Sequence, residues 1–191
     1  MMNRNAGIRI TFPPWVVRAV DWDRAYATPG ERMRLAIELS RQNIEHGLGG
    51  PFGAAVFEEA SGKLVSVGVN LVVAQNNSAL HAEVVALMAA EQRIGRYSLR
   101  AVNGPFYEIV TSCDPCAMCL GAVLWSAVHR VTCGADREDA RAIGFDEGPV
   151  FDESWAYLER QDIEVVRGVM REEAVDVLQL YRKRGGKIYN R

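Results

Sequence analysis

The sequence predicts an α/β fold, a three-layer α–β–α sandwich around a mixed five-stranded sheet. Two observations lead to this prediction. Apolar, β-rich runs alternate with stretches of helical period along the chain, and two of these runs flank the turn "EASG", which is typical of a β-hairpin. With 191 residues, of which 49% are hydrophobic and 24% charged, the chain is long and apolar enough to bury a core.

Residues 1–27 are predicted to be an N-terminal extension, and residues 28–191 a single domain. Pro13 and Pro14 interrupt any early element, while the nearby "WVVRAVDW" is apolar enough to dock on the domain. The extension is therefore expected to pack against the rest of the chain.

The first helix of the domain is predicted over residues 28–47. Thr28 and Glu31 form a capping box, Pro29 suits the first turn and Gly47 suits the end. The later patterns predict, in order, a hairpin (50–73), a helix (76–95), a strand (105–112), a helix (114–128), a strand (129–135), a helix (136–144), a strand (163–169) and a helix (171–186).

The ends of two of these helices carry recognisable signals. Asn77 or Ser78 is expected to cap the helix that Gly95 ends, and Asp114 is expected to cap the next helix, with Pro115 in its first turn.

The charge balance and the four cysteines narrow the class of protein. A net charge of −2 and a pI of about 6.0 do not provide the broad positive field of a nucleic-acid binder. No signal peptide or 18-residue apolar run is recognised, so we expect a cytoplasmic protein with no membrane or nucleic-acid partner. In this reducing compartment, cysteines are more often metal ligands or core residues than members of disulfides.

Two motifs predict a metal centre. "HAEVVAL" places His81 two residues before Glu83, and "DPCAMCLGA" places Cys116 and Cys119 one helical turn apart. Both motifs begin helices, and we expect these helices to start at the same edge of the sheet. The positive end of a helix dipole favours thiolates, and two sulfurs with one imidazole nitrogen suit tetrahedral Zn²⁺.

Glu83 indicates that the predicted zinc site is catalytic. Three protein ligands leave a fourth position for water, whose pKa zinc lowers from about 15.7 to roughly 7. We expect zinc-bound hydroxide to be the nucleophile and Glu83 to be the proton shuttle. The pattern H-x-E followed by P-C-x-x-C is the signature of zinc-dependent base deaminases. A catalytically silent zinc module, or plain core helices, would leave a carboxylate on a buried face without a role.

The other cysteines and histidines are predicted to be structural. Cys113 extends the motif to C-x-x-C-x-x-C, so a site with three cysteines stays open, although a fourth protein ligand would close the site. Cys133 is expected in the core. His46 ends a helix, where it can interact with the dipole, and His129 begins a strand.

The chain resembles the cytidine-deaminase-like superfamily, and within it the bacterial guanine deaminases. The similarity extends from about residue 30 to residue 191, through "GGPFGAAV", "HAEVVAL", "TSCDPCAMCLGAVLWS" and "IGFDEG". It implies a homodimer with a small-molecule nucleobase substrate. The implied reaction is hydrolytic deamination of guanine to xanthine and ammonia, with some activity on aminotriazines such as ammeline.

The resemblance also implies which residues bind the base. Phe52 and Phe145 would stack on it, Asn70 would read the edge of the ring and Trp125 would form a wall of the pocket. Tyr189, in the C-terminal "GGKIYNR", would close the site of its own chain or of a partner.

A second catalytic carboxylate is implied at Glu147, near the leaving amino group. The family usually has aspartate here, and glutamate is one methylene longer. Two other activities share the zinc motifs. Deamination of adenosine in tRNA would require a basic face, and deamination of cytosine or cytidine would favour a smaller pocket.

Overall fold

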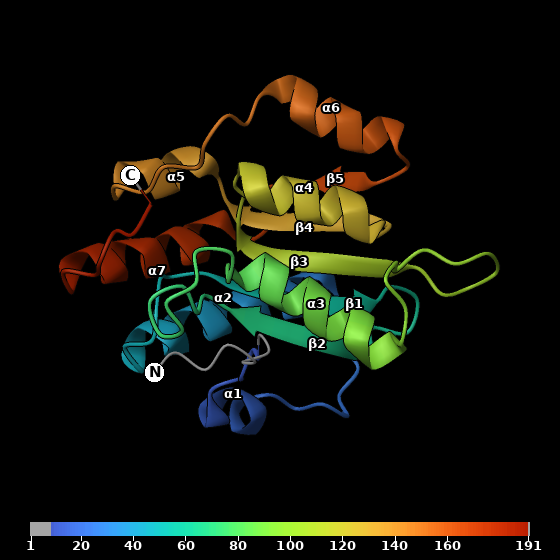
Figure 1. Cartoon of the computed structure of the whole chain (residues 1–191), viewed down its shortest axis with the longest axis horizontal. Coiled ribbons are helices and arrows are strands. Elements are labelled where there is room, and N and C mark those ends of the chain that lie inside the picture. Colours follow the sequence, from blue (N-terminus) through green and yellow to red (C-terminus); the bar gives the residue numbers. More distant parts are fainter. Residues whose placement is uncertain (1–8, 191) are drawn as a thin grey trace, which may run out of the picture.

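A computed structural model of the protein describes residues 9–190, and its centre is a five-stranded mixed sheet (Figure 1). The strand order is β2-β1-β3-β4-β5. Strand β1 is antiparallel to β2 and β3, whereas β4 is parallel to β3 and β5. The predicted sheet is therefore confirmed. The strands are β1 (Gly53–Glu58), β2 (Leu64–Val69), β3 (Tyr107–Cys113), β4 (Arg130–Ala135) and β5 (Glu164–Val166).

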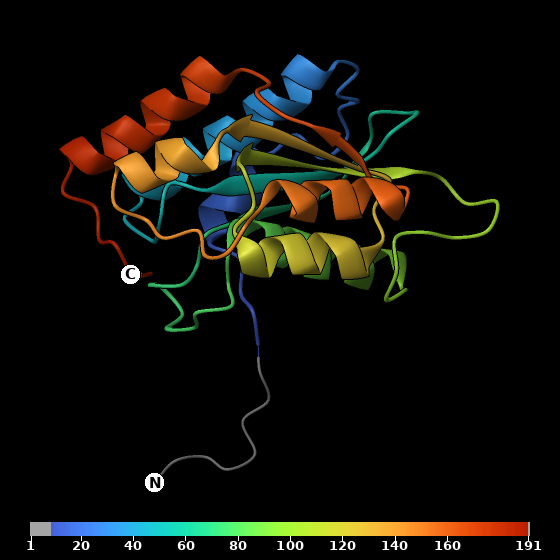
Figure 2. The same cartoon turned by 90° about the horizontal axis from the view of Figure 1, so that it is seen from above.

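Helices cover both faces of the sheet, which confirms the predicted three layers (Figure 2). Helices α2 and α7 pack on one face, and α3, α4 and α6 pack on the other, so each face has its own apolar core. The helices are α1 (Pro14–Ala19), α2 (Pro29–Glu45), α3 (Ala82–Ile94), α4 (Ala117–Ser126), α5 (Arg137–Ala142), α6 (Asp152–Arg160) and α7 (Arg171–Lys183). None of the helices within residues 9–190 is long and apolar enough to cross a membrane.

Helix α2 begins as its sequence predicts. The Thr28 side chain accepts a hydrogen bond from the backbone of Glu31, and the Glu31 carboxylate accepts one from the backbone of Thr28. Gly47, with φ of 65°, follows its C-terminal end. The buried face of α2 packs against β1 and β3, and this contact holds one side of the loop that leads into β1.

Helix α3 begins later than predicted. Its N-cap is His81, not Asn77 or Ser78. The Asn77 carboxamide oxygen accepts instead from the backbone of Ala79 at 3.0 Å, in a turn that closes before the helix starts. This correction moves His81 from the first helical turn to the cap itself.

Helix α4 also begins later than predicted, with Cys116 as its N-cap in place of Asp114. The Asp114 carboxylate is held by the Arg167 guanidinium and by the backbone N–H of Arg137, so it is not free to cap the helix. Pro115 therefore precedes the helix. Both motifs thus place a metal-binding side chain at the N-cap of a helix, where backbone N–H groups are unpaired.

Two further segments complete the fold. Helix α6 is not predicted by the sequence pattern, because its nine residues bury only Trp155 and Leu158. In the N-terminal segment, Trp15 and Val16 are buried in the same core as α2 and α7. Residues 1–8 of the predicted extension lie outside the described residues.

Candidate active site and metal centre

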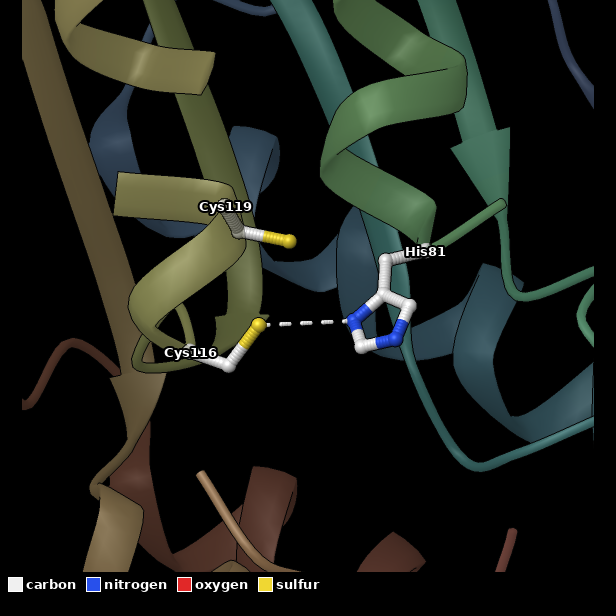
Figure 3. Close-up of side chains that lie close together, drawn as sticks. All are labelled: His81, Cys116 and Cys119. Carbon is white, nitrogen blue, oxygen red and sulfur yellow. Dashed lines mark hydrogen bonds between the residues drawn. The ribbon is translucent and has the colours of Figure 1, made fainter. Parts of the chain in front are cut away.

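The three predicted metal ligands lie together at one edge of the sheet (Figure 3). The ligand atoms of His81, Cys116 and Cys119 all lie within 4.8 Å of one another, and the Cys116 Sγ is 3.5 Å from the His81 Nδ1. The histidine follows β2 and the cysteines follow β3, so two strand-to-helix connections bring them together. This set of two sulfurs and one imidazole nitrogen fits Zn²⁺ and leaves a fourth position open.

The charges around the cluster favour metal binding. A hydrogen bond with Cys119 is the largest of the effects that lower the pKa of the Cys116 thiol to about 4, and His81 contributes a further hydrogen bond. The same pairing, together with burial, raises the pKa of Cys119. Burial alone would lower the pKa of His81, but Cys116 and Glu83 outweigh it and raise that pKa. The chain's own groups thus favour a thiolate at Cys116, the form that binds zinc.

Glu83 lies within the same cluster, one position into α3 from the first residue of the helix. Its side chain is buried, and burial is the main cause that raises its pKa to about 7, with the negative charge of Cys116 adding to the effect. A hydrogen bond from Cys119 acts in the opposite direction. A carboxyl group with a pKa near neutrality can both take and give a proton, as a proton shuttle requires.

Glu147 approaches the cluster from the segment before α6. Its backbone carbonyl accepts a hydrogen bond of 3.0 Å from the N–H of Ala117, the first residue of α4, which docks this segment on the start of the helix. The Glu147 side chain is buried, and burial is the main cause that raises its pKa to about 8. The neighbouring Asp146 is exposed and binds the backbone of Gly148. Only one of these two acidic residues therefore faces the interior.

Three aromatic side chains form a frame beside the metal cluster. The ring of Phe145 lies 5.0 Å from that of Phe52 and 5.2 Å from that of Tyr189, in both cases edge to face. The Tyr189 ring is 6.2 Å from His81. The structure thus brings together three of the four aromatic residues that the family resemblance predicts to bind the base.

The C-terminal tail that carries Tyr189 lies over its own chain's site. The backbone of Asp146 donates to the carbonyl of Asn190, and the Asn190 carboxamide donates back to the carbonyl of Asp146 at 2.7 Å. The Tyr181 hydroxyl donates to the carbonyl of Lys187. These bonds hold the tail to the segment that carries Glu147.

Trp125 does not line the site of its own chain, and this part of the prediction is wrong. Its side chain is 81% exposed, near the C-terminal end of α4. Trp125 follows Cys116 by nine positions, which is about 14 Å along the helix axis at 1.5 Å per residue. The buried face of α4 contains Cys119 and Val123, so Trp125 points away from the sheet.

The remaining sequence predictions concern residues outside the metal cluster. Cys113 and Cys133 are buried in the apolar cores. His46 stacks on Trp15, and His129 stacks on Phe106 with ring centroids 3.7 Å apart.

Sequence reasoning missed two features beside the residues that are predicted to bind the base. Asn43 is a fully buried polar residue on the apolar face of α2, a signal that the pattern of the helix could have revealed. The glycines at 49 and 50 allow a close approach of the chain, because a Cβ on Gly49 would overlap the backbone oxygen of Asn70 and one on Gly50 would overlap the Tyr189 hydroxyl.

Residues 28–135 match the family model of the cytidine and deoxycytidylate deaminase zinc-binding region. The chain belongs to this family of zinc-dependent deaminases. The predicted cofactor and the predicted class of enzyme, a zinc-dependent hydrolytic deaminase, are therefore confirmed, and the cluster of one histidine and two cysteines is suited to hold the ion.

Known proteins that are similar to this chain have two activities, deamination of guanine and deamination of adenosine in tRNA. A guanine deaminase from Bacillus subtilis (strain 168) is 35% identical over 121 residues, which cover 63% of this chain and 73% of that protein. A tRNA-specific adenosine deaminase from Buchnera aphidicola is 32% identical over 152 residues, or 79% of this chain and 91% of that protein. A solved guanine deaminase from Nitrosomonas europaea matches with a TM-score of 0.89 at 42% identity, covering 93% of this chain and 97% of that chain.

Variants of the last enzyme, changed at an asparagine or at a glutamate, have been crystallised with 8-azaguanine. These two positions are as many residues apart as Asn70 and Glu147 are in this chain.

Proposed function

We propose that this protein hydrolyses guanine to xanthine and ammonia. The observation that carries this proposal is the similarity to a guanine deaminase over 93% of the chain, at 42% identity. The arrangement of the site supports it, since the rings of Phe52, Phe145 and Tyr189 lie together beside the metal cluster. A guanine ring is planar and aromatic, so it suits such edge and face contacts.

The metal and the two carboxyl groups have separate roles in the proposed reaction. His81, Cys116 and Cys119 would hold the zinc ion, which would supply a water molecule made nucleophilic at neutral pH. Glu83 takes the proton that this water releases and delivers it to the ring nitrogen next to the carbon that bears the amino group. Glu147 gives a proton to the departing amino group, which leaves as ammonia, and takes one back from the hydroxyl group on the same carbon as that group becomes the carbonyl of xanthine. One water molecule is consumed, and the atoms of guanine and of this water are all present in xanthine and ammonia.

Tyr189 and the aromatic frame exclude water and orient the base in this proposal. The tail is tied to the segment of Glu147 by the two hydrogen bonds between Asp146 and Asn190. Closure of the tail over the base would therefore place the second carboxyl group at the same time.

Deamination of adenosine in tRNA is a second candidate, favoured by the relative from Buchnera aphidicola. Two observations weigh against it. The tail lies across the site, where an RNA strand would have to enter, and the net charge of −2 offers little attraction for phosphates.

We propose that two copies of this chain form a homodimer through the outer face of α4. The ten residues of this helix include no charged residue. Met118 and Trp125 are 41% and 81% exposed, and Met88 on the adjacent α3 is 46% exposed. We expect the protein to act in the cytoplasm, because none of its four cysteines forms a disulfide, which suits a reducing compartment. Light scattering at micromolar concentration should report twice the mass of the chain, and the mass of one chain would contradict the dimer.

The test of the substrate is an ammonia-release assay of the zinc-loaded protein on guanine, guanosine, adenine, cytosine and ammeline. We expect guanine to react fastest. Ammeline should also react, although more slowly, because it presents the same reacting unit as guanine, an amino-bearing carbon between two ring nitrogens. Adenine should react little, since its amino group is at a different ring position. Faster turnover of adenine or cytosine would overturn the assignment.

A further inference from the structure

Asn43 joins the two segments that carry the base-binding residues. It lies on α2 and is fully buried. Its carboxamide nitrogen donates to the backbone oxygens of Gly50 and Asn70, at 2.9 Å in both cases. One of these segments leads to Phe52, and the other follows β2. Both N–H groups of one side chain are therefore used to hold two loops together at the edge of the sheet.

The same arrangement fixes the orientation of the Asn70 side chain. Its Oδ1 accepts from the backbone N–H groups of Gly50 and Val72, each at 3.3 Å. Its backbone N–H donates to the carbonyl of Phe52 at 3.2 Å. Since both neighbours of Oδ1 are donors, the carboxamide cannot turn over without placing its NH₂ against two N–H groups.

The NH₂ group of Asn70 is left over by this network. It is buried, and among the described residues it has no hydrogen-bond partner. A buried donor without a partner is unfavourable, because it has lost its hydrogen bonds to water. Gly50 links this donor to the aromatic frame, because its N–H binds Asn70 while a Cβ on it would overlap the Tyr189 hydroxyl. The carboxamide that carries this free donor is therefore bound to Gly50, which lies against Tyr189 of the aromatic frame.

We propose that Asn43 is a positioning residue that holds the Asn70 carboxamide with its NH₂ toward the substrate. Asn43 thereby determines specificity for bases with a ring acceptor at the edge that Asn70 faces. This inference rests on the proposed function of the site. A site built around a hydrogen bond discriminates strongly against an analogue without that group, because the protein's own buried donor is then unpaired.

The test compares three variants with the wild-type protein. Asn43→Asp replaces the donor with an acceptor of the same shape, and Asn43→Ser keeps a shorter donor in case the first variant does not fold. Asn70→Ala removes the reading group itself. Ser40→Ala is the matched control, since Ser40 is equally buried on the same helix but its hydroxyl binds only the carbonyl of Ile37.

Binding of guanine, 3-deazaguanine and 7-deazaguanine is measured by calorimetry, together with zinc content, on zinc-loaded proteins that all carry Glu83→Gln as well, so that guanine is not consumed. Each deaza analogue has a C–H group in place of one ring nitrogen. The wild type and Ser40→Ala should bind one analogue about tenfold more weakly than guanine, the equivalent of one hydrogen bond. In Asn70→Ala and in both Asn43 variants this ratio should fall to about twofold or less, with zinc retained.

Two results would overturn the inference. The Asn43 variants could weaken binding of all three bases equally and keep the tenfold ratio, which is what a purely structural role predicts. The wild type could also bind all three equally. Failure of the proposed function has a different signature, namely that the wild type binds guanine and releases no ammonia from it.

Discussion

The metal-binding half of the site and its base-binding half are built in different ways. The metal half uses His81, Cys116 and Cys119. These residues lie at the N-termini of α3 and α4, where the connections from β2 and from β3 end. The base half collects side chains from the loop before β1, the end of β2, the segment after α5 and the C-terminal tail. The metal half uses the same local arrangement twice, a ligand at the N-cap of a helix, whereas the base half forms only when distant segments of the chain have folded together.

This difference predicts different consequences of mutation. Changes in the metal half should affect every substrate alike, since they alter the nucleophile or its proton. Changes in the base half should alter the ranking of substrates, because they alter contacts that depend on the shape and edge of the ring. A mutation in the metal half that alters the ranking of substrates, or one in the base half that affects every substrate alike, would show that the two halves are coupled.

Cys116→Ser should have the largest effect. Serine is a poor zinc ligand, and the remaining two ligands cannot complete the site. We expect loss of zinc by metal analysis and loss of ammonia release from every base. Cys113→Ser is the matched control, because Cys113 binds only the carbonyl of Asp136, which a hydroxyl can also do. Loss of zinc in this control as well would favour a site with three cysteines.

Glu83→Gln should retain zinc and lose turnover. General acid–base catalysis contributes about 10²–10⁴-fold, so kcat should fall by that range on guanine and on any slower substrate. Glu91→Gln, two turns further along α3, serves as the control for changing a carboxyl group on this helix. Activity within about tenfold of wild type would show that Glu83 is not the proton shuttle.

Glu147→Gln should have a smaller effect of the same kind. A group that protonates only the leaving amine is expected to contribute near the lower end of that range, roughly 10²-fold in kcat, with little change in KM. Steady-state kinetics on guanine measures both constants. A rise in KM at constant kcat would instead assign Glu147 to substrate binding.

Tyr189→Ala should act on binding and on ranking. Aromatic contacts of this kind contribute about 0.5–1.5 kcal/mol each, so KM for guanine should rise about fivefold, and more than KM for the smaller ammeline ring. Tyr97→Ala is the control, since Tyr97 is 92% exposed. Equal effects on both substrates would place the tail outside base recognition.

Trp125→Ala should have the smallest effect on catalysis by each chain. An exposed side chain outside the site changes free energies by about 0.5 kcal/mol or less, so kcat and KM should stay within about twofold. Light scattering should nevertheless report a weaker dimer, because the substitution removes the largest apolar side chain on the outer face of α4. A stable dimer would place the interface elsewhere.

Much of the fold could be predicted from periodicity and capping signals. The capping box of Thr28 and Glu31 begins α2 as expected, and the hairpin and the later strands occur where the apolar runs indicate them. The caps of α3 and α4 could not be predicted, because Asn77 and Asp114 find partners of their own. Whether a polar side chain caps a helix depends on what else competes for it.

The sequence by itself determined the metal centre and its acid. The spacings in "HAE" and "PCAMC" reflect local helix geometry, which the chain carries wherever these segments fold. Only the tertiary structure decided the base-binding half. It turned Trp125 toward solvent, placed Tyr189 against its own chain's His81 and revealed Asn43 between two loops. These outcomes depend on contacts between distant segments, and neither residue type nor spacing along the chain encodes the direction in which such a side chain points.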